Sequence, residues 1–142
     1  MPCGKTHDRI TFIVLPIVVL IAYLIFNSFY LIHILSISYL FSALMFNGDL
    51  DTNSKSYNRW FVFKMIWIPY QLMFSHRSVF THGILIGTTI RIIYIGMIPF
   101  LYFYYNHDIN ILTDIISTKD LMVVFIGLEL GNISHSFPDW LT

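Results

Sequence analysis

The longest stretch without a charged residue decides what this chain can fold into. Between Ile10 and Phe46 there is no Asp, Glu, Lys or Arg. About 20 apolar residues are enough for one helix to cross the hydrocarbon of a bilayer, so this stretch is too long for a single crossing. The polar pair Asn27-Ser28 interrupts it near its middle. We therefore expect two membrane-spanning helices, over about residues 11–27 and 29–46, with a turn at this pair.

The composition of the whole chain also favours a membrane location. Of its 142 residues, 56 % are hydrophobic and 11 % are charged, whereas soluble domains average about 45–50 % apolar and about 25 % charged residues. One domain of this length could not bury such an excess in a single core. Eight basic and eight acidic residues cancel, so no positive field would attract nucleic acid. We expect a lipid bilayer as the partner, and no nucleic acid.

Two more apolar segments, over about residues 84–105 and 121–134, complete the expected membrane domain. The segment 61–74 is apolar but too short for a span. An interfacial or re-entrant segment fits it better, with its aromatic side chains at headgroup depth, namely Trp60, Trp67 and Tyr70. The predicted fold class is all-α, with residues 1–142 forming one integral membrane bundle of about four transmembrane helices.

Positive charge is distributed unevenly between the two ends of these spans. The N-terminal tail and the loop after the second span carry most of it, whereas the loop after the third span contains only Lys119. The positive-inside rule therefore predicts that both termini are cytoplasmic. This orientation brings ionisable residues from four separate segments to the cytoplasmic face: His7, Asp8, Asp49, Asp51, His76, His82, His135 and Asp139. His33 and His107 fall on the opposite side.

Three of these pairs have a spacing that bears on metal binding. Asp49 and Asp51 point the same way in a turn, although they could equally be helix-capping aspartates. His76 and His82 share an ion only if the backbone bends between them, and could otherwise be interfacial histidines. His135 and Asp139 lie on one face of a helix, four residues apart.

Other features inside the apolar segments have structural or functional readings. Arg91 and Glu129 place charges within spans, where they are costly and usually functional. Gly83-x-x-x-Gly87 and Gly127-x-x-x-Gly131 have the spacing of close helix–helix packing. The sequence contains no Gly-rich phosphate loop and no His-Glu-x-x-His zinc motif.

Several short motifs in a fixed order carry a resemblance to a known family. They are Gly4-Lys5-Thr6-His7-Asp8-Arg9-Ile10, Asp49-Leu50-Asp51, Trp67-Ile68-Pro69-Tyr70, His76-Arg77-Ser78 through Thr81-His82-Gly83, Gly127-Leu128-Glu129-Leu130-Gly131 and His135-x-x-x-Asp139. Over nearly the whole chain they look like a cyanobacterial-type family of metal-binding integral membrane proteins of unknown function. That family is distantly similar to membrane-bound metal-dependent hydrolases and, further off, to zinc-dependent phospholipase C.

The resemblance implies a helical site with His and Asp ligands. Carried over by motif, the ligands here are His7, Asp49, Asp51, His76, His82, His135 and Asp139. Such mixed ligands suit zinc, with manganese or iron as alternatives, better than calcium or magnesium. The resemblance also implies a multi-pass protein of a bacterial inner or thylakoid membrane.

Up to seven ligands could hold two ions, and two-metal sites commonly hydrolyse phosphoesters. We therefore expect a metal-dependent hydrolase acting on a phosphoester at the cytoplasmic face. Asp49 or Asp51 would bridge the metals or act as the base, and Arg77 would stabilise charge on the phosphate. One alternative is a non-catalytic protein in which the metal clips helix ends together. Another is a small transporter, supported only by Arg91 and Glu129.

Overall fold

The computed structural model describes residues 4–76, 78–105 and 117–140, with only the backbone for Asp139 and Trp140. Within these residues every regular element is a helix and there is no strand, which confirms the predicted all-α class. The four long helices are α1 (Gly4–Phe26), α2 (Phe29–Met45), α6 (Ile86–Tyr105) and α8 (Thr118–Trp140). The short helices between them are η1 (Gly48–Asp51), α3 (Lys55–Asn58), η2 (Phe61–Ile66), α4 (Trp67–Met73) and α5 (Val79–His82).

Each long helix is long and apolar enough to cross a membrane. Most large side chains of α1 and α6 face outward, as lipid-facing residues do; Leu24 and Ile93 are examples, at 72 % and 61 % exposure. The last helix extends well beyond the expected segment 121–134 and includes Pro138 in its final turn. His135 and Asp139 therefore do belong to one helix.

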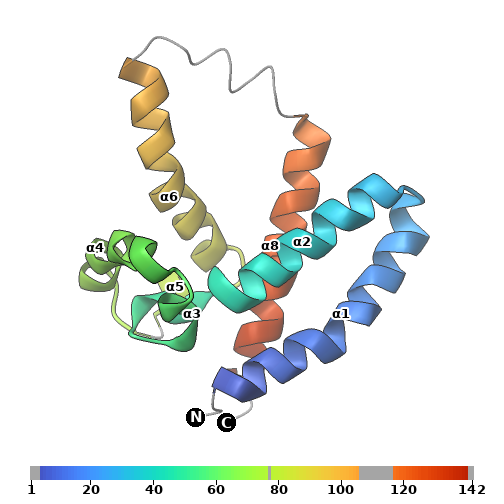
Figure 1. Cartoon of the computed structure of the whole chain (residues 1–142), viewed down its shortest axis with the longest axis horizontal. Coiled ribbons are helices and arrows are strands. Elements are labelled where there is room, and N and C mark those ends of the chain that lie inside the picture. Colours follow the sequence, from blue (N-terminus) through green and yellow to red (C-terminus); the bar gives the residue numbers. More distant parts are fainter. Residues whose placement is uncertain (1–3, 77, 106–116, 141–142) are drawn as a thin grey trace.

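Helices α1, α2 and α8 form the tightest part of the fold (Figure 1). The chain reverses between α1 and α2 at Asn27, whose φ of 44° lies in the left-handed region that asparagine tolerates. Val18 of α1 and Leu35 of α2 pack with Val123 of α8 in one apolar cluster. The N-terminal end of α1 and the C-terminal end of α8 consequently meet.

Two glycines allow α8 to lie directly on the backbone of α2. A Cβ atom added at Gly127 would stand 2.7 Å from the Leu35 carbonyl oxygen, and one at Gly131 would stand 2.4 Å from that of Tyr39. The predicted close packing is therefore confirmed for this pair. It is wrong for the other pair, because Gly83 lies before α6 and Gly87 faces the carbonyl of Thr81 rather than another long helix.

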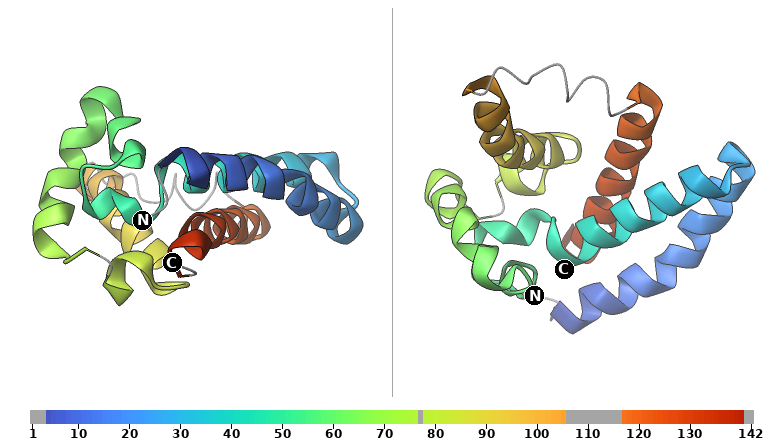
Figure 2. Two further views of the ribbon diagram at one scale, coloured as in Figure 1. Left: turned by 90° about the horizontal axis from the view of Figure 1, so that it is seen from below. Right: turned by 45° about the horizontal axis from the view of Figure 1, so that its top comes forward.

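The short helices η1 to α5 lie together beside the ends of α1 and α8 (Figure 2). The segment 61–74, expected at the interface, consists of the 3-10 helix η2 followed by α4, which ends at Met73. Trp67 and Tyr70, which we expect at headgroup depth, are fully buried within the protein. They pack against Phe46 and Tyr94 as an aromatic core. Leu50 of η1 packs in the same core, and η1 carries both aspartates of the candidate site.

Candidate metal centre

Six of the ionisable side chains singled out by the sequence come together at one end of the long helices. They derive from five separate parts of the chain: His7 from α1, Asp49 and Asp51 from η1, His76 from the turn before α5, His82 from α5, and His135 from α8. Figure 1 shows the beginning of α1 next to the end of α8, with the short helices beside them. The convergence inferred from charge asymmetry is thus present in the fold.

His135 and Asp49 form the first contact of the cluster. The Nδ1–H group of His135 donates to the carbonyl oxygen of Ala43 at 3.1 Å, and its Nε2 lies 3.1 Å from Oδ2 of Asp49. In a neutral imidazole with Nδ1 protonated, Nε2 is a lone pair. A lone pair and a carboxylate oxygen face each other stably only with a cation between them, either a proton or a metal ion. A backbone carbonyl that fixes the opposite nitrogen is typical of metal-ligating histidines.

His82 approaches the other oxygen of the same carboxylate. Its Nε2 is buried, has no hydrogen-bond partner and lies 3.4 Å from Oδ1 of Asp49. The hydroxyl of Thr81 donates to the Ser78 carbonyl, so its oxygen is available to accept from Nδ1 of His82 at 3.0 Å. Asp49 therefore lies between two imidazoles, each of which presents Nε2 to it.

Asp51 and His76 form the second contact of the cluster. Nδ1 of His76 donates to Oδ1 of Asp51 at 2.9 Å, and the carboxylate of Asp51 is fully buried. The rings of His76 and His82 stand 5.7 Å apart. They can approach because α4 ends at Met73 and the backbone bends before α5, which is the bend that their spacing required.

His7 contacts the cluster through His135. Its Nδ1–H donates to the backbone carbonyl of His135 at 2.7 Å, and the two rings stack with centroids 4.4 Å apart. The remaining predicted site residues cannot be placed, because Arg77 and the side chain of Asp139 lie outside the described residues, as does His107. His33 stands apart: it is exposed and bonds the Phe29 carbonyl of its own helix.

The comparison with family models bears on this cluster. Residues 2–142 match the model of a family described as "Uncharacterized metal-binding protein (DUF2227)". The chain belongs to this family. Neither a curated protein nor a solved structure gives a significant match to it.

A metal that the family description implies has to fit the donor atoms present. Among the described residues, no group of three or more His, Cys, Asp or Glu side chains is arranged so that it could hold an ion. The pairwise separations nevertheless suit one. Two ligands each about 2.0–2.1 Å from a tetrahedral ion stand about 3.3 Å apart, and Asp49 lies 3.1 Å and 3.4 Å from its two imidazole nitrogens. The unpartnered Nε2 of His82 also fits, because a metal ion would satisfy it.

The sequence singled out Arg91 as a charge within a span but did not indicate its contacts with the elements that carry the cluster. Arg91 is fully buried, and it donates from Nη1 to the Thr81 carbonyl at 2.6 Å and from Nη2 to Oδ1 of Asn132 at 2.9 Å. It thereby joins α5, which carries His82, to α8, which carries His135. In the sequence, Arg91 is recognisable only as a charged residue inside an apolar segment. Burial raises the pKa of the nearby Tyr70 phenol above its ordinary value, although Arg91 acts to lower it.

Glu129, the other charge within a span, is also engaged in the structure. Its Oε1 accepts from the backbone N–H of Leu85 at 2.8 Å. Leu85 has a φ of 64°, and this break separates α5 from α6. The third long helix therefore begins at Ile86, two residues later than the predicted start at about residue 84. Arg91 and Glu129 both bind backbone groups, which is a structural role for each, and the transporter alternative is not favoured.

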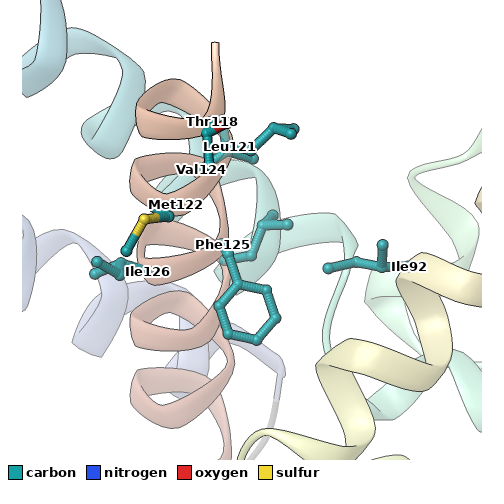
Figure 3. A pocket seen from close by; sticks show the side chains of 8 residues that line it. Ile92, Thr118, Leu121, Met122, Val124, Phe125 and Ile126 are labelled. Atoms are coloured by element: carbon teal, nitrogen blue, oxygen red, sulfur yellow. The ribbon is translucent and has the colours of Figure 1, made fainter. Parts of the chain in front are cut away.

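Cavities of different chemistry lie on the described part of the protein. One of about 210 Å³ opens beside the cluster and is lined by His7, Asp49, His76 and His135 of the cluster and by Lys55 and Arg59. Another, of about 460 Å³, lies between α6 and α8, where Ile92 and Phe125 line an almost wholly apolar space (Figure 3). Of these two cavities, the first is the one lined by ionisable groups that could act on a polar substrate.

Proposed function

We propose that this protein binds a divalent metal ion at the cluster, through His7, Asp49, Asp51, His76, His82, His135 and Asp139. One observation supports this above all: both oxygens of Asp49 face an imidazole Nε2, while the opposite nitrogens are held by Ala43 and Thr81. Imidazole and carboxylate ligands together favour zinc, with manganese or iron as alternatives. The family description supports metal binding without naming the metal.

The reaction that we propose is hydrolysis of a phosphoester. A bound divalent metal would supply an activated water and polarise the phosphoryl group. Asp49 is the carboxylate suited to accept a proton from an attacking water, because it lines the open cavity with 21 % of its side chain exposed. Asp51 is fully buried and instead orients His76. Arg77 is proposed to stabilise charge on the phosphate. The resemblance to membrane-bound metal-dependent hydrolases supports the same reaction.

The site lies at one end of four helices that could span a membrane. We propose a multi-pass protein of a bacterial inner or thylakoid membrane, with both termini and the cluster at the cytoplasmic face. The unequal distribution of Lys and Arg supports this orientation.

A non-catalytic metal clip is a second candidate, favoured by the origin of the side chains. They come from α1, η1, α5 and α8, so one ion would join the ends of these elements. A clip and a hydrolase differ in what removal of the metal does. A hydrolase site loses turnover while the helices stay packed, whereas loss of a clip lowers the stability of the fold itself.

The test uses the full chain purified in detergent, treated with a chelator and then given back Zn²⁺, Mn²⁺ or Fe²⁺. Hydrolysis of bis(p-nitrophenyl) phosphate and the thermal unfolding midpoint are measured before and after. We expect hydrolysis to disappear with the metal and to return with one of the three ions, at an unfolding midpoint changed little. His33→Ala, outside the cluster, should behave like the wild type, and His135→Ala should be inactive. Unfolding on chelation would favour the clip, and hydrolysis that survives chelation would refute a metal-dependent reaction.

A further inference from the structure

Two cations, Lys55 and Arg59, line the 210 Å³ cavity together with residues of the cluster. Arg59 donates from Nη2 to Oδ2 of Asp8 at 2.7 Å, and Lys55 contacts the same oxygen. Arg59 also donates from Nη1 to the Leu44 carbonyl at 2.8 Å. Its guanidinium is therefore held between α1 and the end of α2, at a fixed place beside the cluster.

The charges that line this cavity cancel in the absence of a metal. Asp8 and Asp49 contribute two negative charges, and Lys55 and Arg59 contribute two positive ones. The three lining histidines add none while they are neutral. One divalent ion at the cluster would make the charge beside the cavity more positive by two units, part of which the buried carboxylate of Asp51 offsets. An anion is therefore expected to bind far more tightly to the metal-loaded protein than to the metal-free protein.

We propose that Lys55 and Arg59 form a phosphate-binding wall, which holds a phosphate group of the substrate against the metal centre. The proposal rests on the metal site described above. A guanidinium matches the oxygens of a phosphate in geometry, and a lysine adds a mobile point charge. Asp8 is a positioning residue, because it holds both cations and faces them toward the cavity.

The size of the cavity limits which part of a substrate enters. Sites that enclose a drug-sized ligand measure about 300–1,000 Å³, and this one measures about 210 Å³. A phosphate group fits, while the alcohol to which it is esterified would extend outside. Since the cavity lies at the end of the candidate spans, that alcohol can belong to a lipid or to a water-soluble ester.

The structural alternative is that Lys55 and Arg59 only tie α1 to α3 through Asp8. A tie of this kind affects the unfolding midpoint but not the affinity for phosphate. Lys55 is the better residue to replace, because 45 % of its side chain is exposed whereas Arg59 also supports the Leu44 backbone. Lys64 provides the matched control, since it lies over the Tyr57 ring and not among the residues of the cavity.

The experiment measures binding of inorganic phosphate to the full-length protein in detergent, with and without Co²⁺, by broadening of the ³¹P resonance and by calorimetry. Metal content is determined for every sample by elemental analysis. We expect Lys55→Ala to weaken phosphate binding roughly tenfold, as loss of one hydrogen bond to a charged group does. Metal content should be unchanged, and Lys64→Ala should bind like the wild type. Competition by glycerol phosphate and by dihexanoyl phosphatidic acid then distinguishes a soluble from a lipid source.

The two proposals fail in different ways. Equal phosphate affinity in wild type and Lys55→Ala, at equal metal content, overturns the phosphate-binding wall and leaves the metal site standing. Phosphate binding that needs Lys55 but is the same without metal overturns the coupling between the two sites. A wild-type protein that takes up no Co²⁺ overturns the metal site instead.

Discussion

Replacing Gly131 by alanine adds one methyl group at the crossing of α8 and α2. The new Cβ would stand 2.4 Å from the Tyr39 carbonyl oxygen and 2.7 Å from Cβ of Ser42. Ordinary contact begins at 3.4 Å, so the helices must separate by about 1 Å, the difference between 3.4 and 2.4 Å. Overpacking of this kind costs about 1–3 kcal/mol. The nearest atom is backbone, which cannot rotate away as a side chain would.

The matched control is Gly96→Ala in α6, where an added Cβ meets nothing within 4 Å. Both replacements gain the same helix propensity, about 1 kcal/mol for Gly to Ala in a helix interior. Their difference therefore isolates the packing cost. Unfolding of both variants in detergent should show Gly131→Ala less stable than Gly96→Ala by roughly 1–3 kcal/mol.

The same substitution should also disturb the cluster. His135 lies one turn after Gly131 and donates to the Ala43 carbonyl of α2, so moving α8 away from α2 lengthens that hydrogen bond. We expect weaker metal binding in Gly131→Ala and unchanged binding in Gly96→Ala. Equal unfolding free energies and equal metal affinities for the two variants would refute the close packing of α8 on α2.

Two further predictions concern the buried arginine and the orientation. Arg91→Met leaves the buried acceptors at Thr81 and Asn132 unpaired, and should lower the free energy of unfolding by about 1–3 kcal/mol for each of them. Denaturant unfolding measures this loss. The control Arg9→Met, at an exposed position of α1, should change the stability little. In a Cys3→Ser background, single cysteines placed at Asn53 and Asn110 should react with an impermeant maleimide from opposite sides of the membrane. Labelling of both positions from the same side would refute the four-span orientation.

The fold class could be predicted from the sequence because one property, the absence of charge from Ile10 to Phe46, excludes most alternatives. The gathering of His7, Asp49, His82 and His135 was also predictable. When successive helices cross a bilayer in opposite directions, the start of one helix and the end of the next lie at the same membrane face. Residues near those ends therefore come together. The geometry within the cluster could not be predicted from the sequence. The pairing of each histidine nitrogen with a carboxylate oxygen depends on packing between distant segments.

Other features of the structure are not indicated by any local sequence pattern. Trp67 and Tyr70 have the composition of an interfacial belt, and only their contacts with Phe46 and Tyr94 reveal a core. The break at Leu85 occurs in a leucine with positive φ, a conformation that no turn motif predicts. The ion pairs of Asp8 with Lys55 and Arg59 join residues far apart in the chain, and neither charge pattern nor spacing indicates them.

The metal content of the purified protein, measured by elemental analysis over a panel of histidine variants, tests the candidate metal centre most directly. Wild type and His33→Ala should carry the same amount of a divalent metal. His82→Ala and His135→Ala should lose the metal. Replacing residues that only contact a ligand typically lowers metal affinity roughly 10–100-fold, and removing a ligand itself should cost at least as much. Asp51→Asn should also lose the metal, with little change in side-chain shape. Metal that is retained in His82→Ala and His135→Ala, or stripped by His33→Ala, would contradict the site.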